Sequence, residues 1–231
     1  KKFNKVKVEK MLEDYINKLK PEVLKIFKKD SSGHDITHLQ RTMRVALLLQ
    51  KYEGGDEIVV GISAFLHDVH RIMQNETGKF IAPKDSLGKI KEILSVVDLE
   101  EEKIKKILHA IEYHEVYNWN NPKNKEDDIN TLILQDADNL DAIGAIGIGR
   151  AFLYCGAHNI PMYDDTIPLH TENDYAEEDG DSESTIHHFY HKLLKLGSNM
   201  NTKKAKELAK NRIEVMEKFT DEFLKEWNGE I

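Results

Sequence analysis

Apolar residues recur at three- and four-residue spacing along almost the whole chain. Of all features of the sequence, this period restricts the possible folds the most. Such spacing places apolar side chains on one face of an α-helix. The 231 residues include 13 glycines but only 5 prolines, which gives little sign of a sheet-and-turn architecture. The sequence therefore predicts an all-α fold.

Polar breaks and turn residues divide this pattern into expected helices. They cover residues 6–20, 21–29, 36–52, 56–72, 87–97, 99–116, 129–154, 184–197 and 201–227. Pro21 is expected to begin a new helix, because proline suits the first helical position. Gly54 and Gly55 end another helix, and Ser86 is a candidate cap. Residues 157–182 are acidic and lack a clear period, so we expect a mobile loop there and interpret it as a candidate lid.

Three glycines lie within 129–154, the most apolar stretch of the chain: Gly144, Gly147 and Gly149. Glycine lowers helix stability. Their presence therefore indicates a close approach of a neighbouring helix or of a substrate to the backbone.

Charge and cysteine content limit the classes of partner. The net charge of −8 supplies no sequence-wide basic field for a nucleic-acid backbone, so an anionic substrate must meet a local metal or Arg/Lys cluster. Cys155 is the one cysteine, which permits no internal disulfide and suits a small core residue. No apolar run reaches membrane-spanning length, and no basic-then-apolar leader opens the chain. We expect a cytoplasmic protein with a small-molecule partner, no nucleic acid and no membrane; a homo-oligomer is possible.

Four residues with metal-binding side chains lie on apolar helical segments. They are His38, the adjacent pair His67 and Asp68, and Asp138. Burying such groups is unfavourable unless each finds a partner. A divalent metal can pair with all four, since imidazole and carboxylate are both metal ligands. A lone histidine on an apolar helix is more often a hydrogen-bonded core residue, so the prediction depends on the set. If the four converge, the chain is a metal-dependent hydrolase.

Five motifs in order carry a closer resemblance. They are GHDITHLQR (33–41), AFLHDV (64–69), LQDADNLDAIGAIGIGRAF (134–152), STIHHFYHKLLKL (184–196) and MNTKKAKELAKNR (200–212). Together they resemble the HD-domain metal-dependent phosphohydrolase superfamily, and within it the small bacterial hydrolases of the YpgQ/YedJ type. The resemblance spans about residues 20–228 and implies a single HD-domain helical bundle over 1–231, with the long loop before the C-terminal helices.

The resemblance also implies which residues hold the metal. The ligand positions fall on His38, three residues before Arg41, on His67 and Asp68, and on Asp138, two residues before a leucine. Asp136 is the near rival of Asp138, and Asp141 is a plausible acid behind the ligands. For both, a hydrogen-bonding role in the fold is about as plausible as ligation. Mn²⁺ is the favoured ion, with Fe, Co, Ni, Zn or Mg as alternatives.

Further residues are candidates for catalysis and substrate binding. His34 and Asp35 precede His38 by one turn and could position water or substrate, although an N-cap role for Asp35 is an equal contender. His114 resembles an extra metal or phosphate contact of some superfamily members and is favoured over His109. The expected catalytic set is Asp68, His67, Asp35 and His114. The expected substrate contacts are Arg41, Lys192, Arg150, His188 and His34.

Other residues are interpreted as structural. A solvent-facing position is expected for His70, and surface positions for His187 and His191. Arg44 and Arg212 are further candidates for phosphate binding; a solvated surface charge is the favoured role for Arg44 and a fair alternative for Arg212. Aromatic residues that could stack on a base are more often core residues; they are Tyr113, Tyr117 and Trp119.

The expected activity is hydrolysis of (d)NTPs to (d)NMP and pyrophosphate through a metal-activated water. The residues alone indicate only a phosphohydrolase; the nucleotide comes from the resemblance. One alternative is an HD-type phosphomonoesterase, 5′-nucleotidase or phosphodiesterase. A second is a non-catalytic, metal-containing helical regulatory module. A di-iron oxygenase is more remote, because it needs ligands beyond these four.

Overall fold

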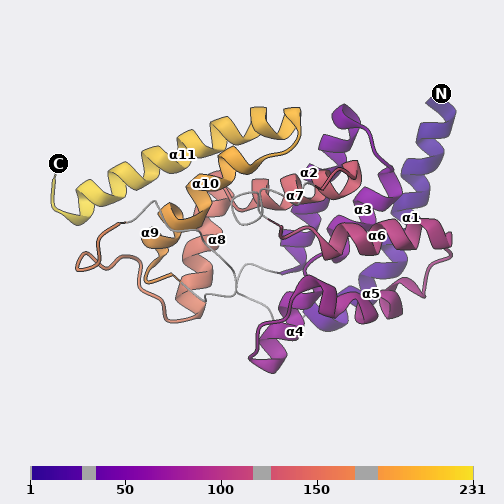
Figure 1. Ribbon diagram of the computed structural model, residues 1–231, viewed down its shortest axis with the longest axis horizontal. Coiled ribbons are helices and arrows are strands. Elements are labelled where there is room, and N and C mark those ends of the chain that lie inside the picture. The colour runs from indigo at the N-terminus through magenta and orange to yellow at the C-terminus, as the bar shows by residue number, and fades with distance from the viewer. Residues whose placement is uncertain (1, 28–34, 117–125, 170–181, 231) are drawn as a thin grey trace.

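The computed structural model describes residues 2–27, 35–116, 126–169 and 182–230, and in these ranges it contains helices and no strand (Figure 1). The all-α prediction is confirmed. The longer helices are α1 (Lys2–Phe27), α2 (Ile36–Glu53), α3 (Glu57–Leu66), α4 (Val69–Thr77), α5 (Leu87–Leu94), α6 (Glu101–Glu112), α7 (Ile129–Asp141), α8 (Gly144–Ala157) and α11 (Lys203–Trp227). Shorter turns are η1 (Pro83–Ser86), α9 (Thr185–His188), η3 (Phe189–Leu193), α10 (Leu194–Leu196) and η4 (Gly197–Asn199).

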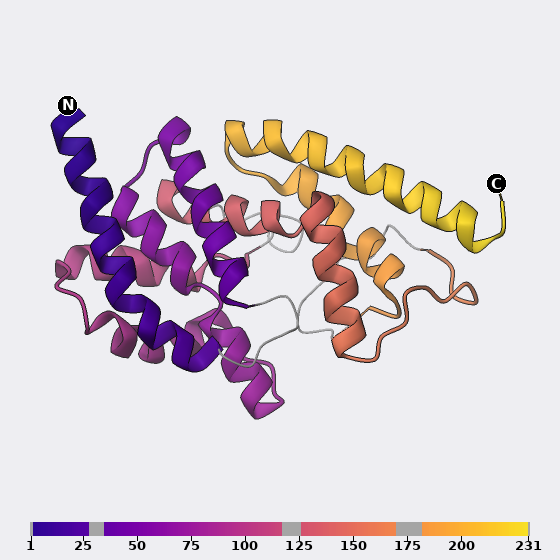
Figure 2. The same cartoon turned by 180° about the vertical axis from the view of Figure 1, so that it is seen from behind.

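Helix α3 forms the centre of the N-terminal part of the molecule. It packs against α1, α2, α6 and α7, and every residue from Ile58 to Leu66 is buried. Helices α8 to α11 gather at the other end, where α11 packs along α8 and also reaches α7 and α2 (Figures 1 and 2). Helix α7 therefore contacts both groups of helices.

Helix α1 continues through Pro21, so the expectation of two helices that meet there is wrong. Its buried face is formed by Leu12, Leu19, Val23 and Phe27. The spacing of these residues keeps them on one face of a continuous helix across the proline. Burial of that face, part of which packs on α3, outweighs the backbone hydrogen bond that a proline inside a helix removes.

The expected helix 56–72 is interrupted at His67 and Asp68, which form a turn between α3 and α4. Asp68 has φ −90° and ψ 14°, outside the α-helical region. The apolar pattern conceals this break, because Leu66 and Val69 on either side are both buried.

The expected helix 129–154 is also divided, since α7 and α8 are bent by 71° relative to each other. Gly144 opens α8 with a φ of +76°, and a Cβ there would lie 3.0 Å from Cβ and Cγ of Arg212 in α11. A Cβ on Gly147 would lie 2.2 Å from a backbone carbonyl oxygen, whereas one on Gly149 would meet nothing within 4 Å. A close approach of a neighbouring helix is confirmed at Gly144. At Gly147 the near atoms belong to the backbone of Ala142, five residues earlier, and no described atom approaches Gly149. An approach of the substrate to these glycines stays a prediction.

Smaller differences occur elsewhere. Ser86 occupies the N-cap position of α5, but its hydroxyl donates to the carbonyl of Pro83 at 2.7 Å and makes no cap contact. The expected helix 184–197 is divided into α9, a π-helical turn (η3), α10 and η4. The part of the expected loop at 158–169 contains no helix; positions 170–181 fall outside the described residues. Among the described helices no single one is long and apolar enough for a membrane span, and α7 with α8 meets that test only as a bent pair.

Candidate metal centre

The first turn of α2 positions His38. Asp35 is the N-cap residue, and its carboxylate accepts a hydrogen bond from the His38 backbone N–H at 2.9 Å and from the Thr37 hydroxyl at 2.7 Å. The capping alternative for Asp35 is therefore the one that the contacts show, while its catalytic role stays a prediction. Capping fixes the start of α2. The His38 side chain is fully buried as a result of this placement.

The turn between α3 and α4 positions His67 and Asp68. His67 closes α3, and its Nδ1 donates to the carbonyl of Ala64 at 2.9 Å. This bond fixes the ring so that Nε2, the other nitrogen, carries the free lone pair. In a continuous helix the adjacent Asp68 would point about 100° away. The break in the helix brings both side chains to one place.

Four side chains with metal-binding atoms meet between α2, α3 and α7; we call His38, His67, Asp68 and Asp138 the first cluster. The Nε2 atoms of His38 and His67 lie 3.2 Å apart. His38 Nε2 lies 3.3 Å from Asp68 Oδ2 and 3.4 Å from Asp138 Oδ1. His67 Nε2 lies 3.5 Å from Asp138 Oδ1 and 3.6 Å from Asp68 Oδ1. The structure thus brings together the four residues that the sequence predicts to converge.

The first cluster fits a divalent ion. Nitrogen and oxygen ligands lie about 2.0–2.2 Å from a first-row ion, which places neighbouring ligand atoms about 3–3.5 Å apart. The distances of 3.2 to 3.6 Å that join the two imidazoles to each other and to the two carboxylates agree with that spacing. Two facing ring nitrogens and two carboxylates also require a positive charge between them. Asp138, whose side chain is 21% exposed, is the member that reaches the surface.

The pKa of His38 also indicates that the first cluster needs a positive charge. Burial and the nearby guanidinium of Arg150 lower the pKa of His38. Hydrogen bonds to three carboxylates, those of Asp138, Asp141 and Asp68, outweigh both effects and raise this pKa to about 10. Burial raises the pKa of Asp138, but its bonds to the two histidines hold it well below the usual range. Without a metal, the cluster therefore retains a proton.

Asp141 lies directly behind His38. Its Oδ2 accepts from His38 Nδ1 at 2.7 Å, which leaves Nε2 as the ring's donor atom for a metal. Arg41 binds both carboxylate oxygens, through Nε at 2.9 Å and Nη2 at 3.0 Å, and Arg150 Nη1 donates at 3.0 Å. The plausible role of Asp141 as an acid behind the ligands matches these contacts. They also place two expected phosphate contacts, Arg41 and Arg150, beside the first cluster.

Asp136 faces away from the first cluster. Its carboxylate accepts hydrogen bonds from the backbone N–H groups of Asn201 and Thr202, each at 2.7 Å. Thr202 is the N-cap residue of α11. Asp136 therefore holds the start of α11 on α7. This is the hydrogen-bonding role in the fold that the sequence offered as the alternative to metal binding.

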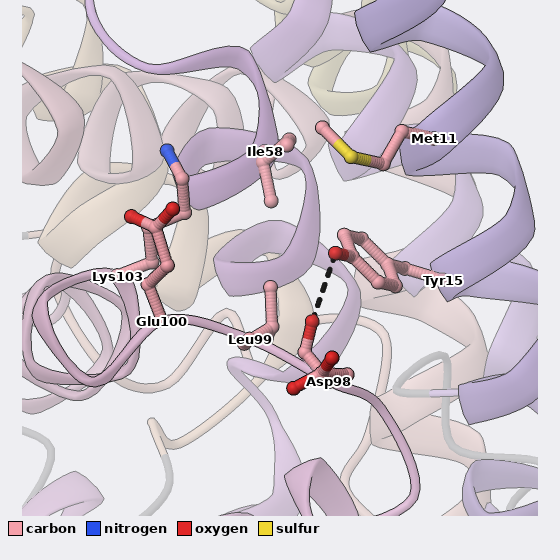
Figure 3. A pocket seen from close by; sticks show the side chains of 7 residues that line it. All are labelled: Met11, Tyr15, Ile58, Asp98, Leu99, Glu100 and Lys103. Atoms are coloured by element: carbon pink, nitrogen blue, oxygen red, sulfur yellow. Dashed lines mark hydrogen bonds between the residues drawn. The ribbon is translucent and has the colours of Figure 1, made fainter.

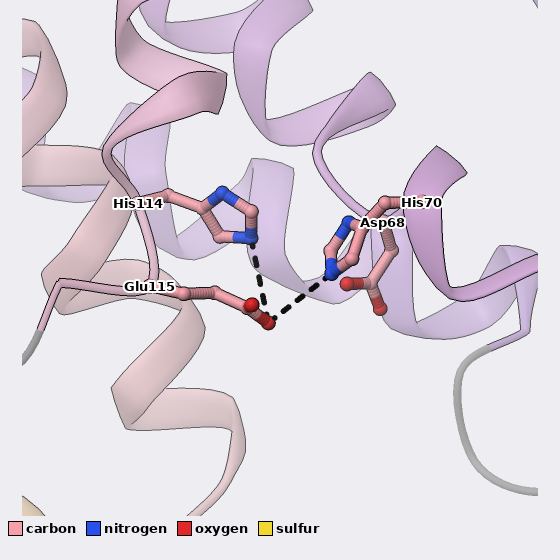
Figure 4. Close-up of side chains that lie close together, drawn as sticks. All are labelled: Asp68, His70, His114 and Glu115. Atoms are coloured by element: carbon pink, nitrogen blue, oxygen red, sulfur yellow. Dashed lines mark ion pairs between the residues drawn. The ribbon is translucent and has the colours of Figure 1, made fainter. Parts of the chain in front are cut away.

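A second group of titratable side chains adjoins the first; Asp68, His70, His114 and Glu115 are called the second cluster (Figure 4). His70 is fully buried, so the expectation that it faces solvent is wrong. Glu115 forms an ion pair with Arg71. Burial raises the pKa of Glu115, but Arg71 and His70 hold it well below its usual range. Burial lowers the pKa of His114 to about 4, which keeps its imidazole neutral.

Sequence reasoning missed Glu115 and misplaced His70. Two signals were present. Residue 70 lies three positions after His67, a spacing that keeps two side chains on neighbouring faces. Glu115 directly follows His114, the histidine that the resemblance favours.

The remaining expected substrate contacts are His188, Lys192 and His34. His188 Nδ1 lies 3.3 Å from Ser182 Oγ, and α9 packs on α8. Lys192 belongs to the π-helical turn η3. His34 falls outside the described residues, as do two of the candidate stacking aromatics, Tyr117 and Trp119. The binding roles of all these residues stay predictions.

Surface positions were expected for two further histidines. His187 is fully buried, where its Nε2 lies 3.1 Å from the carbonyl oxygen of Ile167, so the expectation is wrong for it. His191 is largely buried, with 13% of its side chain exposed. His109 is exposed and pairs with Glu126, which agrees with the preference for His114.

A hollow of about 270 Å³ opens between α1, the start of α3 and the start of α6 (Figure 3). It is lined by Met11, Tyr15, Ile58, Asp98, Leu99, Glu100 and Lys103. The Tyr15 hydroxyl donates to the Asp98 carbonyl at 2.9 Å, and Lys103 pairs with Asp56. The hollow shares no residue with either cluster and offers no metal-binding histidine.

A buried His/Asp donor set held between helices is typical of metal-dependent hydrolases. Comparison with known proteins gives the family. A model of the HD domain matches residues 35–143. YpgQ of Bacillus subtilis (strain 168) is 30% identical over 207 residues, which cover 90% of this chain and 91% of YpgQ. The chain belongs to the HD-domain superfamily of metal-dependent phosphohydrolases.

Solved structures agree with this assignment. The crystal structure of an HD-superfamily hydrolase from Bacillus thuringiensis matches with a TM-score of 0.68 and 36% identity, over 96% of this chain and 98% of that one. The structure of B. subtilis YpgQ in complex with ADP matches with a TM-score of 0.64 and 29% identity, over 89% of this chain and 96% of that one. The fold and the family of the chain are thereby established together.

Proposed function

We propose that the protein hydrolyses nucleoside triphosphates, both ribo- and deoxyribonucleotides, to the nucleoside monophosphate and pyrophosphate. The observation that carries the proposal is the convergence of four metal-binding side chains next to two arginines. The nucleotide is supported by YpgQ, which has been crystallised with ADP. Mn²⁺ is the proposed ion, because mixed imidazole and carboxylate ligands suit a first-row metal better than Mg²⁺.

Each residue of the first cluster has a defined part in this proposal. His38, His67, Asp68 and Asp138 would hold the ion. When bound, the ion supplies positive charge to a phosphate oxygen and lowers the pKa of a water molecule. Asp141 fixes the orientation of the His38 ring through its 2.7 Å hydrogen bond.

Arg41 and Arg150 would bind the phosphate chain. Both contact Asp141, with side chains 24% and 15% exposed. A guanidinium carries five N–H donors, so an arginine held by a carboxylate can still donate to a phosphate oxygen. Asp141 thus keeps two cations at the edge of the first cluster, where the charge of a triphosphate requires them.

The test is product identification with Mn²⁺-loaded protein and a panel of NTPs and dNTPs, followed by ³¹P NMR in ¹⁸O-labelled water. We expect pyrophosphate, with the label in the monophosphate, since that pattern reports attack at the α-phosphorus. Orthophosphate without pyrophosphate would instead indicate a phosphatase or 5′-nucleotidase. Asp68→Ala should lose both metal and turnover, and His109→Gln serves as the control because His109 pairs with Glu126 away from the clusters.

A further inference from the structure

The face that α11 turns toward α7 and α8 contains an arginine among apolar and small residues (Figures 1 and 2). Ala205, Ala209, Met216 and Thr220 recur at helical spacing on α11, and all four are buried. Arg212 occupies the position of this series between Ala209 and Met216, where the pattern predicts an apolar side chain. Burial lowers the pKa of Arg212, because the charged guanidinium loses solvent there. A charge in such a place is unfavourable unless it finds a partner.

The partner of Arg212 is the last turn of α7. The Nη1 atom of Arg212 donates to the carbonyl of Leu140. In a continuous helix this carbonyl would accept from the N–H of residue 144, but the chain bends by 71° between α7 and α8. The contact from the N–H of Ile143 is long, at 3.4 Å. Arg212 therefore supplies the hydrogen bond that the bend weakens, and it places a cation at the end of α7 where the helix dipole favours one.

Gly144 makes room for this contact. A Cβ at position 144 would lie 3.0 Å from both Cβ and Cγ of Arg212, so the arginine stem crosses directly over the glycine. The apolar stem packs at the bend while the guanidinium reaches the helix end. One side chain thus joins the end of α7, the start of α8 and the middle of α11.

The turn that Arg212 holds carries two residues of the metal centre. Asp138 belongs to the first cluster, and Asp141, three residues later, accepts the hydrogen bond of His38 Nδ1 at 2.7 Å. Leu140 lies between them in the chain. The terminal turn of a helix frays unless it is capped. The directions of both carboxylates therefore depend on what fixes this turn.

We propose that Arg212 is a positioning residue of the metal centre, which fixes the last turn of α7 through the Leu140 carbonyl and thereby the carboxylates of Asp138 and Asp141. This role differs from phosphate binding, the other role considered for Arg212. It rests on the metal-dependent function proposed above. Because Mn²⁺ binding is measured without nucleotide, a failure of this proposal is distinguishable from a wrong choice of substrate.

The test compares variants of the full chain by calorimetric titration with Mn²⁺ after chelator treatment. Arg212→Met keeps an apolar stem within the buried face and removes the guanidinium, so we expect it to fold. Its Mn²⁺ affinity should fall about tenfold or more, as is typical when a group that orients metal ligands is lost. Arg212→Lys keeps the charge but has a shorter reach, so its loss should be smaller and still measurable.

Two controls lie on the same helix. Met216→Ala removes a buried side chain one turn further along the same face, and it should lower stability in urea without changing Mn²⁺ affinity. Lys210→Met, at an exposed position, should change neither property.

Wild-type Mn²⁺ affinity in Arg212→Met would overturn the proposal. An equal loss of affinity in Met216→Ala would also overturn it, because the effect would then belong to the general packing of α11. Tripolyphosphate is the second probe: normal Mn²⁺ affinity with weakened tripolyphosphate binding in Arg212→Met would make the arginine a phosphate contact instead. If Arg212→Met does not fold by circular dichroism, Arg212→Lys decides, and wild-type affinity in that variant would refute the role.

Discussion

The carboxylate of Asp141 accepts a 2.7 Å hydrogen bond from Nδ1 of His38, and it turns the other ring nitrogen toward His67, Asp68 and Asp138. The two residues lie 103 positions apart in the chain. Asp141 also gathers Arg41 and Arg150. Orientation of a metal-binding ring and placement of two cations therefore depend on one side chain.

Asp141→Asn tests this dependence. The asparagine oxygen can still accept the hydrogen bond from His38 Nδ1. However, the variant loses the negative charge that pairs with the arginines. The same charge makes the His38 ring a better metal ligand. Residues that orient a ligand in this way typically contribute 10- to 100-fold to metal affinity. We expect a loss of Mn²⁺ affinity of about that size by calorimetry. Asp127→Asn, an exposed acid before α7, is the matched control and should bind Mn²⁺ normally.

The protonation of His38 predicts how metal removal changes the response to pH. The folded-state pKa of about 10 lies above the ordinary histidine pKa of 6.5, so the bound proton stabilises the metal-free fold fully below pH 6.5. That contribution is lost as pH rises through about 10. The melting temperature of chelator-treated protein should therefore fall across this window, and Mn²⁺-loaded protein should not show the fall.

The same proton competes with the metal. Mn²⁺ affinity should increase with pH up to about 10, with release of protons that calorimetry in buffers of different ionisation enthalpy can count. Proton release that is absent throughout this range would contradict the assignment of His38 as a ligand.

Asp136 should affect stability and leave metal binding intact. Asp136→Ala leaves the backbone N–H groups of Asn201 and Thr202 without their acceptor, at a cost of about 1–3 kcal/mol. Urea denaturation should show this loss. Mn²⁺ content per folded molecule should match the wild type, and a loss of metal would instead make Asp136 a ligand.

Two glycines in α8 should respond to alanine in opposite directions. Gly144→Ala places a Cβ at a φ of +76° and 3.0 Å from the Arg212 side chain, so we expect a destabilisation of about 1–3 kcal/mol. Gly149→Ala meets nothing within 4 Å and should stabilise the helix by about 0.5–1 kcal/mol. The pair is compared by thermal or urea denaturation, and equal effects would contradict the described break between α7 and α8.

The helical period was sufficient to predict the class of fold, because almost every helix buries one apolar face. It could not show where helices bend. At Pro21 the packing of a continuous face outweighs a local preference, so one helix occurs where two were expected. At His67 and Asp68 the reverse occurs, since apolar residues on both sides of a turn imitate a single helix.

The candidate site, like the fold, could be predicted only in part from the sequence. Residue chemistry and the HD resemblance predicted the convergence of His38, His67, Asp68 and Asp138. The resemblance favoured Asp138 over Asp136, but neither source could predict what Asp136 does, because its partners lie at the start of α11. The burial of His70 likewise depends on the turn at Asp68, which redirects the start of α4.

The family match ends at residue 143, yet α7 is anchored from beyond that point. Asn201 and Thr202 donate to Asp136, and Arg150 donates to Asp141. A fragment cut at the end of the match would retain all four donors of the first cluster but leave two aspartates on α7 without these neighbours. The segment that the HD-domain model covers is therefore smaller than the unit whose contacts hold the two aspartates of α7 in place.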